Sequence, residues 1–292
     1  FENFMNARAD DYIFDVTCEI GSQMSDRWTA KPLFAGEYDF KVDIYKNNLI
    51  VASAESKIVV TDKTEGEGVS KTCIVIGDST TYYGISTGEM VKLFEDDAMD
   101  LTLIGSRGKD GNFREGISSY TVDDFLNNRA SPFKFGEFDF TEYMLTYGYE
   151  ELHYVIIHLG INDAFAFTDD ESLNAAMPAF MENYQLLVDK IKAYDANLKI
   201  GVCVTIPPAA SQDAFGKVYG CKQTQYRVKR NNIIWNKALI AQFKGKEVEG
   251  IYLLPINVNI DTVNNYPTET SVPNSRNETE IAIQKDALHP AD

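Results

Sequence analysis

The segment after residue 70 contains five apolar runs, each about as long as one β-strand. Longer segments separate the runs, and the runs do not alternate in polarity. Runs of this kind are typical of parallel strands, which helices bury on both faces. The pattern predicts an α/β fold with a doubly wound, five-stranded parallel sheet. The runs are residues 73–76, 101–104, 154–157, 200–204 and 251–254.

Two segments between these runs have the periodicity of amphipathic helices. Apolar residues recur at steps of three and four from Leu173 to Ile191. A second set occupies residues 223–243 and includes Trp235. In a sheet whose strands alternate with helices, ligands bind beyond the carboxyl ends of the strands. Functional residues are therefore expected where the apolar runs end.

Residues 1–69 differ in character, and we expect them to form a small β-sandwich-like accessory domain. They contain strand patterns and no helical period. The strand patterns are residues 12–16, 38–44 and 49–51. The polar residues 61–68 are predicted to be a linker. The α/β domain is then predicted to occupy residues 70–292.

The charge of the chain excludes several classes of partner. With 44 acidic and 27 basic residues, its formal net charge is −17, which repels phosphate backbones and anionic membrane surfaces. No apolar run approaches the roughly 18 residues of a membrane span. We expect a soluble protein that binds no nucleic acid, and its oligomeric state stays open.

A serine follows the first apolar run, in the sequence Gly77-Asp78-Ser79-Thr80. A turn between a strand and a helix provides backbone N–H groups and a positive helix end, and both stabilise a developing oxyanion. The same turn is also structurally ordinary. Ser79 is therefore a candidate nucleophile that the turn alone does not establish.

An asparagine follows the third run, in the sequence Gly160-Ile161-Asn162-Asp163. The Asn162 amide could donate a hydrogen bond to an oxyanion. It could equally cap a helix or form an Asx-turn. Both interpretations stay open from this segment alone.

Near the end of the sequence, Asp286 precedes His289 by three residues. One turn can bring this carboxylate to the imidazole, where it fixes the tautomer of the histidine and stabilises its cation. The other two histidines, His153 and His158, flank the third apolar run, a place where a histidine is more often structural. His289 is therefore the preferred candidate base, and the other two are expected to be structural.

These three segments, taken in order, resemble the motif blocks of the SGNH (GDSL-like) hydrolase family over roughly residues 70–292. The resemblance implies a flavodoxin-like sheet and an acyl-enzyme mechanism without a metal or an organic cofactor. It implies a triad of Ser79, Asp286 and His289. The oxyanion would be bound by the backbone N–H of Ser79, the side chain of Asn162 and a backbone N–H of the second block.

The supporting positions of those blocks are also present, and one block departs from the family pattern. Asp78, Gly160 and Asp163 match the supporting positions. The second block is residues 115–121, in which Ser119 stands where the family usually has glycine. A backbone donor needs only its N–H, so Ser119 can serve if its φ and ψ angles allow.

Three further points qualify that block pattern. Gly116 is the fallback donor for the second block. Thr80 replaces the leucine of the GDSL name, at a position less constrained by mechanism. The segment 84–88 matches the G-x-S-x-G pattern, but no apolar strand precedes it directly, so Ser86 is not the expected nucleophile.

The ends of the sequence and its cysteines lead to further expectations. The first residue is Phe1 rather than Met, which indicates a processed form or a fragment. The sequence stops at Asp292, three residues after His289, whereas the family usually continues into a closing helix. A truncated record is the preferred explanation, and a chain that ended there would anchor its triad loop poorly. A disulfide between Cys203 and Cys221 stays open.

Members of the resembled family cleave carboxylic esters or thioesters, and the loops rather than the triad determine the substrate. Two long stretches, residues 207–224 and 255–283, are predicted to be irregular and to form a lid or a binding surface. Aromatic residues near the motif blocks could stack on sugar rings or serve only in packing. These aromatic residues are Tyr82, Tyr83, Tyr120 and Phe165.

The accessory domain and these aromatic residues favour a carbohydrate O-acetyl esterase, secreted or on the surface of a bacterial cell. A lipid esterase, lysophospholipase or thioesterase is the nearest alternative. A broad apolar groove would favour a lipid substrate, and a small acyl pocket would favour acetate. From another class, the chain could be a carbohydrate-binding surface protein whose hydrolase site has decayed.

Overall fold

The computed structural model describes residues 1–5, 9–31 and 34–291, and the last residue, Asp292, lies outside the described residues. The chain divides into two compact units. The first comprises Phe1–Val69 with Asp97–Met99, and the second comprises Ser70–Asp96 with Asp100–Asp292.

The first unit contains a three-stranded antiparallel sheet in the order β1-β4-β5. Its strands are β1 (Ile13–Cys18), β4 (Gly36–Lys46) and β5 (Leu49–Val60), and a short pair consists of β2 (Ser22–Gln23) and β3 (Trp28–Thr29). Two short 3-10 helices, η1 (Glu2–Phe4) and η2 (Ala9–Asp11), precede β1. Aromatic side chains contact one another in this unit, and Phe1 stacks on Phe14 with ring centroids 4.5 Å apart. The sandwich-like arrangement itself stays a prediction.

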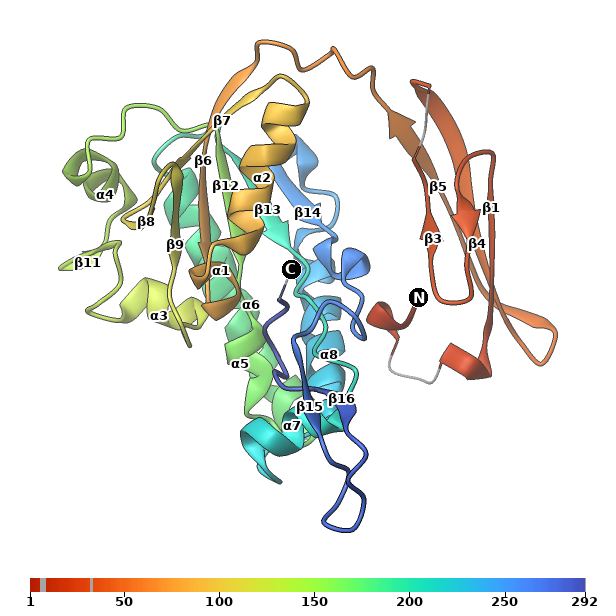
Figure 1. Cartoon of the computed structure of the whole chain (residues 1–292). Helices are drawn as coiled ribbons and strands as arrows, with labels where there is room; N and C mark the ends of the chain where they lie inside the picture. The colour runs from red at the N-terminus through yellow and green to blue at the C-terminus, as the bar shows by residue number, and fades with distance from the viewer. Residues whose placement is uncertain (6–8, 32–33, 292) are drawn as a thin grey trace. The chain divides into compact units, whose positions relative to one another are not determined.

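The second unit is built on a sheet whose five parallel strands are the five apolar runs of the sequence. In space their order is β7-β6-β12-β13-β14, which is the flavodoxin-like order (Figure 1). The predicted α/β fold is therefore confirmed. The strands are β6 (Ser70–Gly77), β7 (Asp100–Ile104), β12 (Tyr154–His158), β13 (Lys199–Cys203) and β14 (Ile251–Leu254).

A hairpin that the sequence patterns do not predict extends the sheet. Strand β9 (Asn112–Gly116) pairs in parallel with the carboxyl end of β6, and β8 (Arg107–Lys109) pairs antiparallel with β9. These short strands are rich in charged and polar residues. They therefore lack the apolar runs by which the other strands are recognised.

Helices cover the two faces of this sheet unequally (Figure 1). The main core lies between one face and α3 (Val122–Asn127), α4 (Phe140–Thr146), α6 (Asp170–Lys192) and α8 (Gln225–Phe243). A smaller core lies between Cys73, Val75 and Leu103 of the other face and helix α2 (Ile85–Asp96). The two helices expected from periodicity are α6 and α8, and Trp235 of α8 is fully buried.

The two stretches predicted to be irregular contain regular elements. Helix α7 (Gln212–Tyr219) lies in the first, capped by Ser211 and with Phe215 buried. The second contains η4 (Ile256–Asn259) and an antiparallel pair, β15 (Thr268–Ser271) with β16 (Ile281–Gln284). These elements span four to eight residues, which is too short for periodicity to show in the sequence. The remaining elements are α1 (Ser79–Tyr82), β10 (Lys134–Phe135), β11 (Glu137–Phe138), α5 (Ile161–Phe165) and η3 (Glu247–Glu249).

All four cysteines are free thiols. Cys203 is buried, Cys221 is exposed, and both are free thiols, so the disulfide left open by the sequence is not formed.

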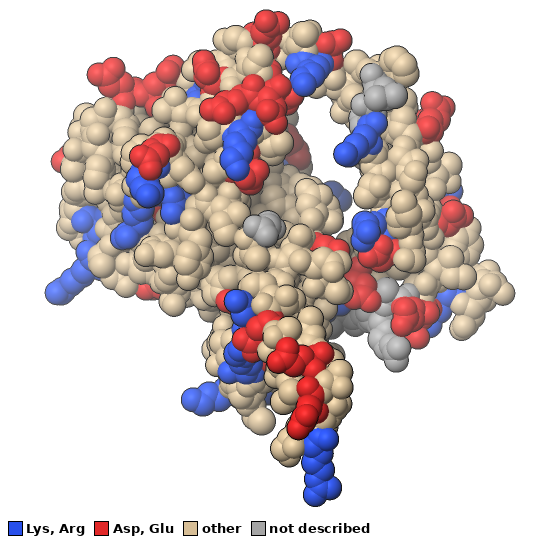
Figure 2. Space-filling view, viewed as in Figure 1, with Lys and Arg blue, Asp and Glu red and all other residues tan. Residues whose placement is uncertain are grey.

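Among the described residues, no helix combines the length and the apolar character needed to cross a membrane. On the face shown in Figure 2, Lys and Arg side chains lie among acidic ones without forming a continuous basic patch.

Candidate active site

The three motif blocks meet at the carboxyl edge of the parallel sheet. Ser79 follows β6 and opens α1, and Asn162 follows β12 and lies in α5. The segment after β16 carries Asp286 and His289. Ser79 and Asn162 lie at one edge because the parallel strands end there, whereas Asp286 and His289 reach that edge on a segment that follows a separate antiparallel pair.

Asp78 determines the conformation of the turn that carries Ser79. Its carboxylate is buried and accepts hydrogen bonds from the backbone N–H of Thr80, at 2.9 Å, and from the Thr80 hydroxyl, at 2.8 Å. It is therefore the N-cap of α1. Ser79 is the first residue of that helix, where backbone N–H groups have no intrahelical partner and can bind an anion.

The structure brings Ser79, His289 and Asp286 into one hydrogen-bonded chain. The Ser79 Oγ lies 2.8 Å from the His289 Nε2. The His289 Nδ1 lies 3.1 Å from each carboxylate oxygen of Asp286. If Nδ1 carries the proton that binds Asp286, Nε2 is free to accept the proton of the serine hydroxyl.

The electrostatics of this pair lower the pKa of Asp286 and raise the pKa of His289. Burial favours the neutral form of Asp286. Hydrogen bonds from the His289 ring and from the backbone N–H groups of Leu288 and His289 outweigh the effect of burial and lower the pKa of Asp286 to about 2. The hydrogen bond to Asp286 raises the pKa of His289 above its usual value, although burial opposes the change. His289 is therefore a stronger base than an isolated imidazole.

The segment that carries Asp286 and His289 is anchored by contacts with other parts of the chain. Ala287, between them, is fully buried, and its carbonyl accepts a 3.0 Å hydrogen bond from the backbone N–H of Ala209. The backbone N–H of Ala291 donates to the carbonyl of Asn265 at 2.7 Å. These contacts come from the two long stretches of chain, whose interactions are not visible in the sequence.

Asn162 directs its amide toward the space beside the serine turn. Its Nδ2 donates to the carbonyl oxygen of Tyr120 at 3.0 Å and approaches an oxygen of Asp78 at 3.4 Å. The second contact is long and therefore weak. The amide hydrogen that makes this contact with Asp78 can instead be donated to a stronger acceptor, such as an oxyanion.

Ser119 has a backbone conformation that favours glycine. Its φ is +65°, in the left-handed region, and the side chain is exposed in the turn between β9 and α3. Gly116, the fallback donor, is required for a different reason. A Cβ on Gly116 would lie 2.5 Å from the backbone nitrogen of Tyr82 in α1.

The supporting residues Asp163 and Gly160 hold the neighbouring backbone. Asp163 is buried, and its carboxylate accepts a 3.1 Å hydrogen bond from the backbone N–H of Val122, the first residue of α3. Burial raises the pKa of Asp163 to about 7 despite that bond. Gly160 has a φ of +126°, and a Cβ there would lie 2.1 Å from the indole of Trp235.

One polar pair in the site was not anticipated. The Thr80 hydroxyl lies 3.2 Å from the Nδ1 of His158, a buried ring whose pKa is lowered by burial. Because the same hydroxyl donates to Asp78, it accepts from a protonated Nδ1. The His158 ring thus supports the Thr80 hydroxyl, and the Nδ1 of His153 accepts from the backbone N–H of Thr72. That both histidines are only structural stays a prediction.

Ser86, in the G-x-S-x-G pattern, lies inside α2 and not between a strand and a helix. It is exposed and has no hydrogen bond to a histidine among the described residues. The glycines of the pattern shape the backbone around Ser86. Gly84 has a φ of +73°, and its carbonyl accepts from the Thr87 hydroxyl at 3.1 Å.

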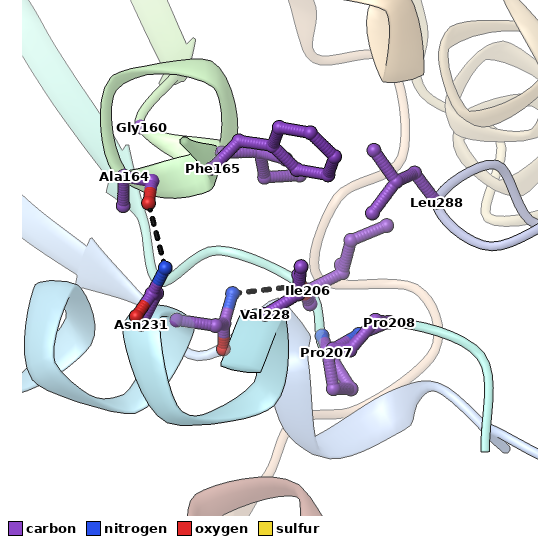
Figure 3. A pocket seen from close by; sticks show the side chains of 11 residues that line it. Gly160, Ala164, Phe165, Ile206, Pro207, Pro208, Val228, Asn231 and Leu288 are labelled. Carbon is purple, nitrogen blue, oxygen red and sulfur yellow. Dashed lines mark hydrogen bonds between the residues drawn. The ribbon is translucent and has the colours of Figure 1, made fainter. Parts of the chain in front are cut away.

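Two hollows of very different size lie close to these residues. The smaller, shown in Figure 3, holds about 10 Å³ and includes Ile161 and Leu288, the neighbours of Asn162 and His289. In Figure 3 the side chains of Phe165 and Leu288 face the rest of its lining. The larger hollow has a volume of about 400 Å³ and a mostly apolar lining. Its lining includes Val75, Thr80, Tyr83, Ile156, Leu254 and His289.

No family model matches this chain, and no curated protein matches it. Among solved structures, the family 3 carbohydrate esterase of Clostridium thermocellum has 16% sequence identity and a TM-score of 0.44, over 66% of this chain and 80% of that one. The lipase/acylhydrolase of Enterococcus faecalis has 11% identity and a TM-score of 0.43, over 76% and 87%. A GDSL-like lipase of Bacteroides thetaiotaomicron has 16% identity and a TM-score of 0.41, over 76% and 80%. Likenesses this distant assign no activity to the chain, so its activity has to be argued from its own site.

The left-handed conformation of Ser119 leads to a first testable expectation. Ser119→Gly removes the steric cost of a Cβ at φ +65° and should raise the free energy of unfolding by about 0.5–1 kcal/mol. Ser119→Val should lower it, because a β-branched side chain is poorly tolerated there. Urea unfolding followed by circular dichroism measures both changes. Equal stability of the three proteins would contradict the assigned conformation.

The Asp286–His289 pair leads to a second testable expectation. In Asp286→Asn the hydrogen bond that raises the pKa of His289 loses its charged acceptor, so the pKa should fall toward the ordinary imidazole value of about 6.5 or below. An NMR titration of the ring C–H resonances measures it, with His153 and His158 as internal references. Unchanged titration of His289 would show that the two side chains are not paired in solution.

Proposed function

We propose that this protein is a serine esterase that hydrolyses carboxylic esters through an acyl-enzyme, and that its substrates are O-acetyl groups of carbohydrates. The observation that carries the proposal is the hydrogen-bonded chain from Ser79 through His289 to Asp286. A serine hydroxyl gains nucleophilicity when a neighbouring base accepts its proton, and a carboxylate behind that base stabilises the cation that forms.

The proposed reaction begins with attack of the Ser79 Oγ on the ester carbonyl carbon while His289 Nε2 takes the hydroxyl proton. The carbonyl oxygen becomes an oxyanion, with the Ser79 and Ser119 backbone N–H groups and the Asn162 amide as donors. Each such donor lowers the barrier by about 3 kcal/mol. His289 then gives the proton to the departing alcohol oxygen, and a water molecule activated by His289 hydrolyses the acyl-enzyme.

The preference for an acetyl group rests on the sizes of the two hollows. Because His289 must protonate the leaving oxygen, the alcohol part of the substrate has to lie on the His289 side of Ser79. The oxyanion points toward the Asn162 amide, and the acyl group takes the remaining direction. We assign the acyl group to the hollow of about 10 Å³, whose lining includes Ile161 and Leu288, the neighbours of Asn162 and His289. A space of that size holds about one water-sized group, which favours a small acyl group over a long chain.

The aromatic residues near the site divide into two groups. Tyr82 and Tyr83 are 44% and 63% exposed, and the Tyr83 ring lies 6.0 Å from the His289 ring, edge to face. An exposed ring beside the base is suited to stacking on a sugar. Tyr120 and Phe165 instead pack against Phe125 and Tyr219. A carbohydrate polymer as substrate would in turn favour a secreted or cell-surface location.

One observation favours the alternative of a lipid or long-chain ester. The hollow of about 400 Å³ beside His289 has a mostly apolar lining, to which Val75, Ile156 and Leu254 of the sheet contribute. Such a lining suits an alkyl chain better than a sugar. The decayed-site alternative finds no such support, because Ser79 lies within hydrogen-bond reach of His289.

The esterase proposal is tested by comparing the wild type with Ser79→Ala on p-nitrophenyl acetate. The variant retains the fold but lacks the nucleophile, and we expect kcat/KM to fall by about 10⁴-fold or more. Activity of the wild type should rise with pH through the raised pKa of His289, since the base must be neutral. Equal hydrolysis by the two proteins would refute Ser79 as nucleophile.

Acyl length is tested on p-nitrophenyl esters from C2 to C12 and by acetate release from acetylated polysaccharide. If the acyl group occupies the hollow of about 10 Å³, kcat/KM should fall by about tenfold or more beyond C4, because each misplaced methylene disturbs the reacting geometry. Tyr83→Ala should then raise KM for the polysaccharide and leave p-nitrophenyl acetate unaffected. A maximum at C8 or above would instead assign the large apolar hollow to the substrate chain.

A further inference from the structure

Arg114, in strand β9, binds the backbone at the end of the helix that carries Ser79. Its Nε donates to the carbonyl oxygens of Thr81 and Tyr82, at 3.0 Å each, and its Nη2 also donates to Tyr82. Its Nη1 donates to the carbonyl of Asn112 in its own strand at 2.8 Å. A single guanidinium thus binds the last two carbonyls of α1, and the Thr81 carbonyl also accepts from the backbone N–H of Gly84 at 3.0 Å.

Helix α1 depends on such contacts because it has only four residues. A single helical turn is unstable in isolation, since one or two hydrogen bonds do not offset the entropy of fixing its backbone. Asp78 caps its beginning, and Arg114 binds its end. The position of Ser79 is therefore set by side chains on both sides of the turn.

Two glycines allow strand β9 to approach this turn closely. A Cβ on Gly116 would lie 2.5 Å from the backbone nitrogen of Tyr82. A Cβ on Gly84 would lie 2.5 Å from the Cζ of Arg114. The guanidinium thus packs directly on the backbone at Gly84, and no other residue type fits at either position without displacement.

Asn112 makes a second connection between the same strand and the same turn. Its Nδ2 donates to the carbonyl of Gly84 at 2.8 Å, and its Oδ1 accepts from the Thr87 hydroxyl at 2.6 Å. Among the described residues no carboxylate forms an ion pair with Arg114, and its guanidinium donates to backbone carbonyls. Arg114 is thus committed to holding the backbone.

We infer that Arg114 is a positioning residue for the reaction at Ser79, an inference that rests on the esterase function proposed above. It holds α1 against β9, and the loop that follows β9 carries Ser119. Arg114 therefore fixes the nucleophile relative to a donor of the oxyanion site without touching the substrate. A displacement of about 1 Å between such groups can cost about 100-fold in rate.

The kinetic test compares Arg114→Met, which keeps the apolar stem and removes every donor, with Lys109→Met as control. Lys109 is a cation of the same hairpin with an 89% exposed side chain. On p-nitrophenyl acetate, Arg114→Met should lower kcat by about 10- to 100-fold and leave KM within about twofold. Arg114→Lys, which keeps the charge and fewer donors, should recover part of kcat. The control should match the wild type.

Hydrogen exchange of the backbone amides of residues 81–84 gives a second measurement that does not depend on activity. These amides bond within the turn, for example Tyr82 to the carbonyl of Asp78 at 3.0 Å. They should exchange faster in Arg114→Met, with no change in helix α6. If the wild type hydrolyses no ester, the proposed function fails, and this exchange still tests the connection between Arg114 and α1.

Three results would overturn the inference. An active wild type with an unchanged kcat per folded molecule in Arg114→Met would reduce Arg114 to a stabilising contact, even if the unfolding temperature fell. Unchanged exchange in residues 81–84 would show that Arg114 does not hold the turn. If Arg114→Met does not fold, Arg114→Lys is compared with the wild type instead, and a wild-type kcat in that variant would contradict the need for a forked donor.

Discussion

The parallel pairing of strand β6 with β12 and β9 is the constraint on which the site depends. Gly77, the last residue of β6, lies beside His158 of β12 and beside Gly116 of β9. The segments that follow β6, β12 and β9 therefore leave the sheet at the same level. A shift of one residue in either register would move a donor by about 3.3 Å, which is more than a hydrogen bond tolerates. Gly77 itself cannot carry a side chain, because its Cβ would lie 2.1 Å from the Thr81 hydroxyl oxygen.

The parts of the fold that sequence reasoning predicted are those whose signal is local. The five buried strands are recognisable as apolar runs, and α6 and α8 are long enough for their periodicity to show. The candidate triad was identified because Ser79 and His289 lie in compact motifs of distinctive composition. In the structure their side chains lie 2.8 Å apart, while their catalytic roles stay a proposal.

What could not be predicted depends on contacts between residues far apart in the sequence. The bond from Thr80 to His158 joins residues 78 positions apart, and nothing in either segment points to the other. Arg114 looks like one more surface charge in the sequence, yet its guanidinium binds α1. The anchoring of the segment that carries Asp286 and His289 depends on such contacts as well. Buried Ala287 is held by Ala209, which belongs to another stretch of the chain.

The distance in sequence between Ser79 and His289, 210 residues, has a consequence for biosynthesis. The serine is made early, and during most of synthesis no imidazole is available to it in this geometry. The pair can meet only after β12, β13 and β14 have joined β6 and the segment after β16 has docked. Loop closure over such a span is slow compared with local folding. Under the proposed function, the reactivity of Ser79 therefore appears only with the completed tertiary structure.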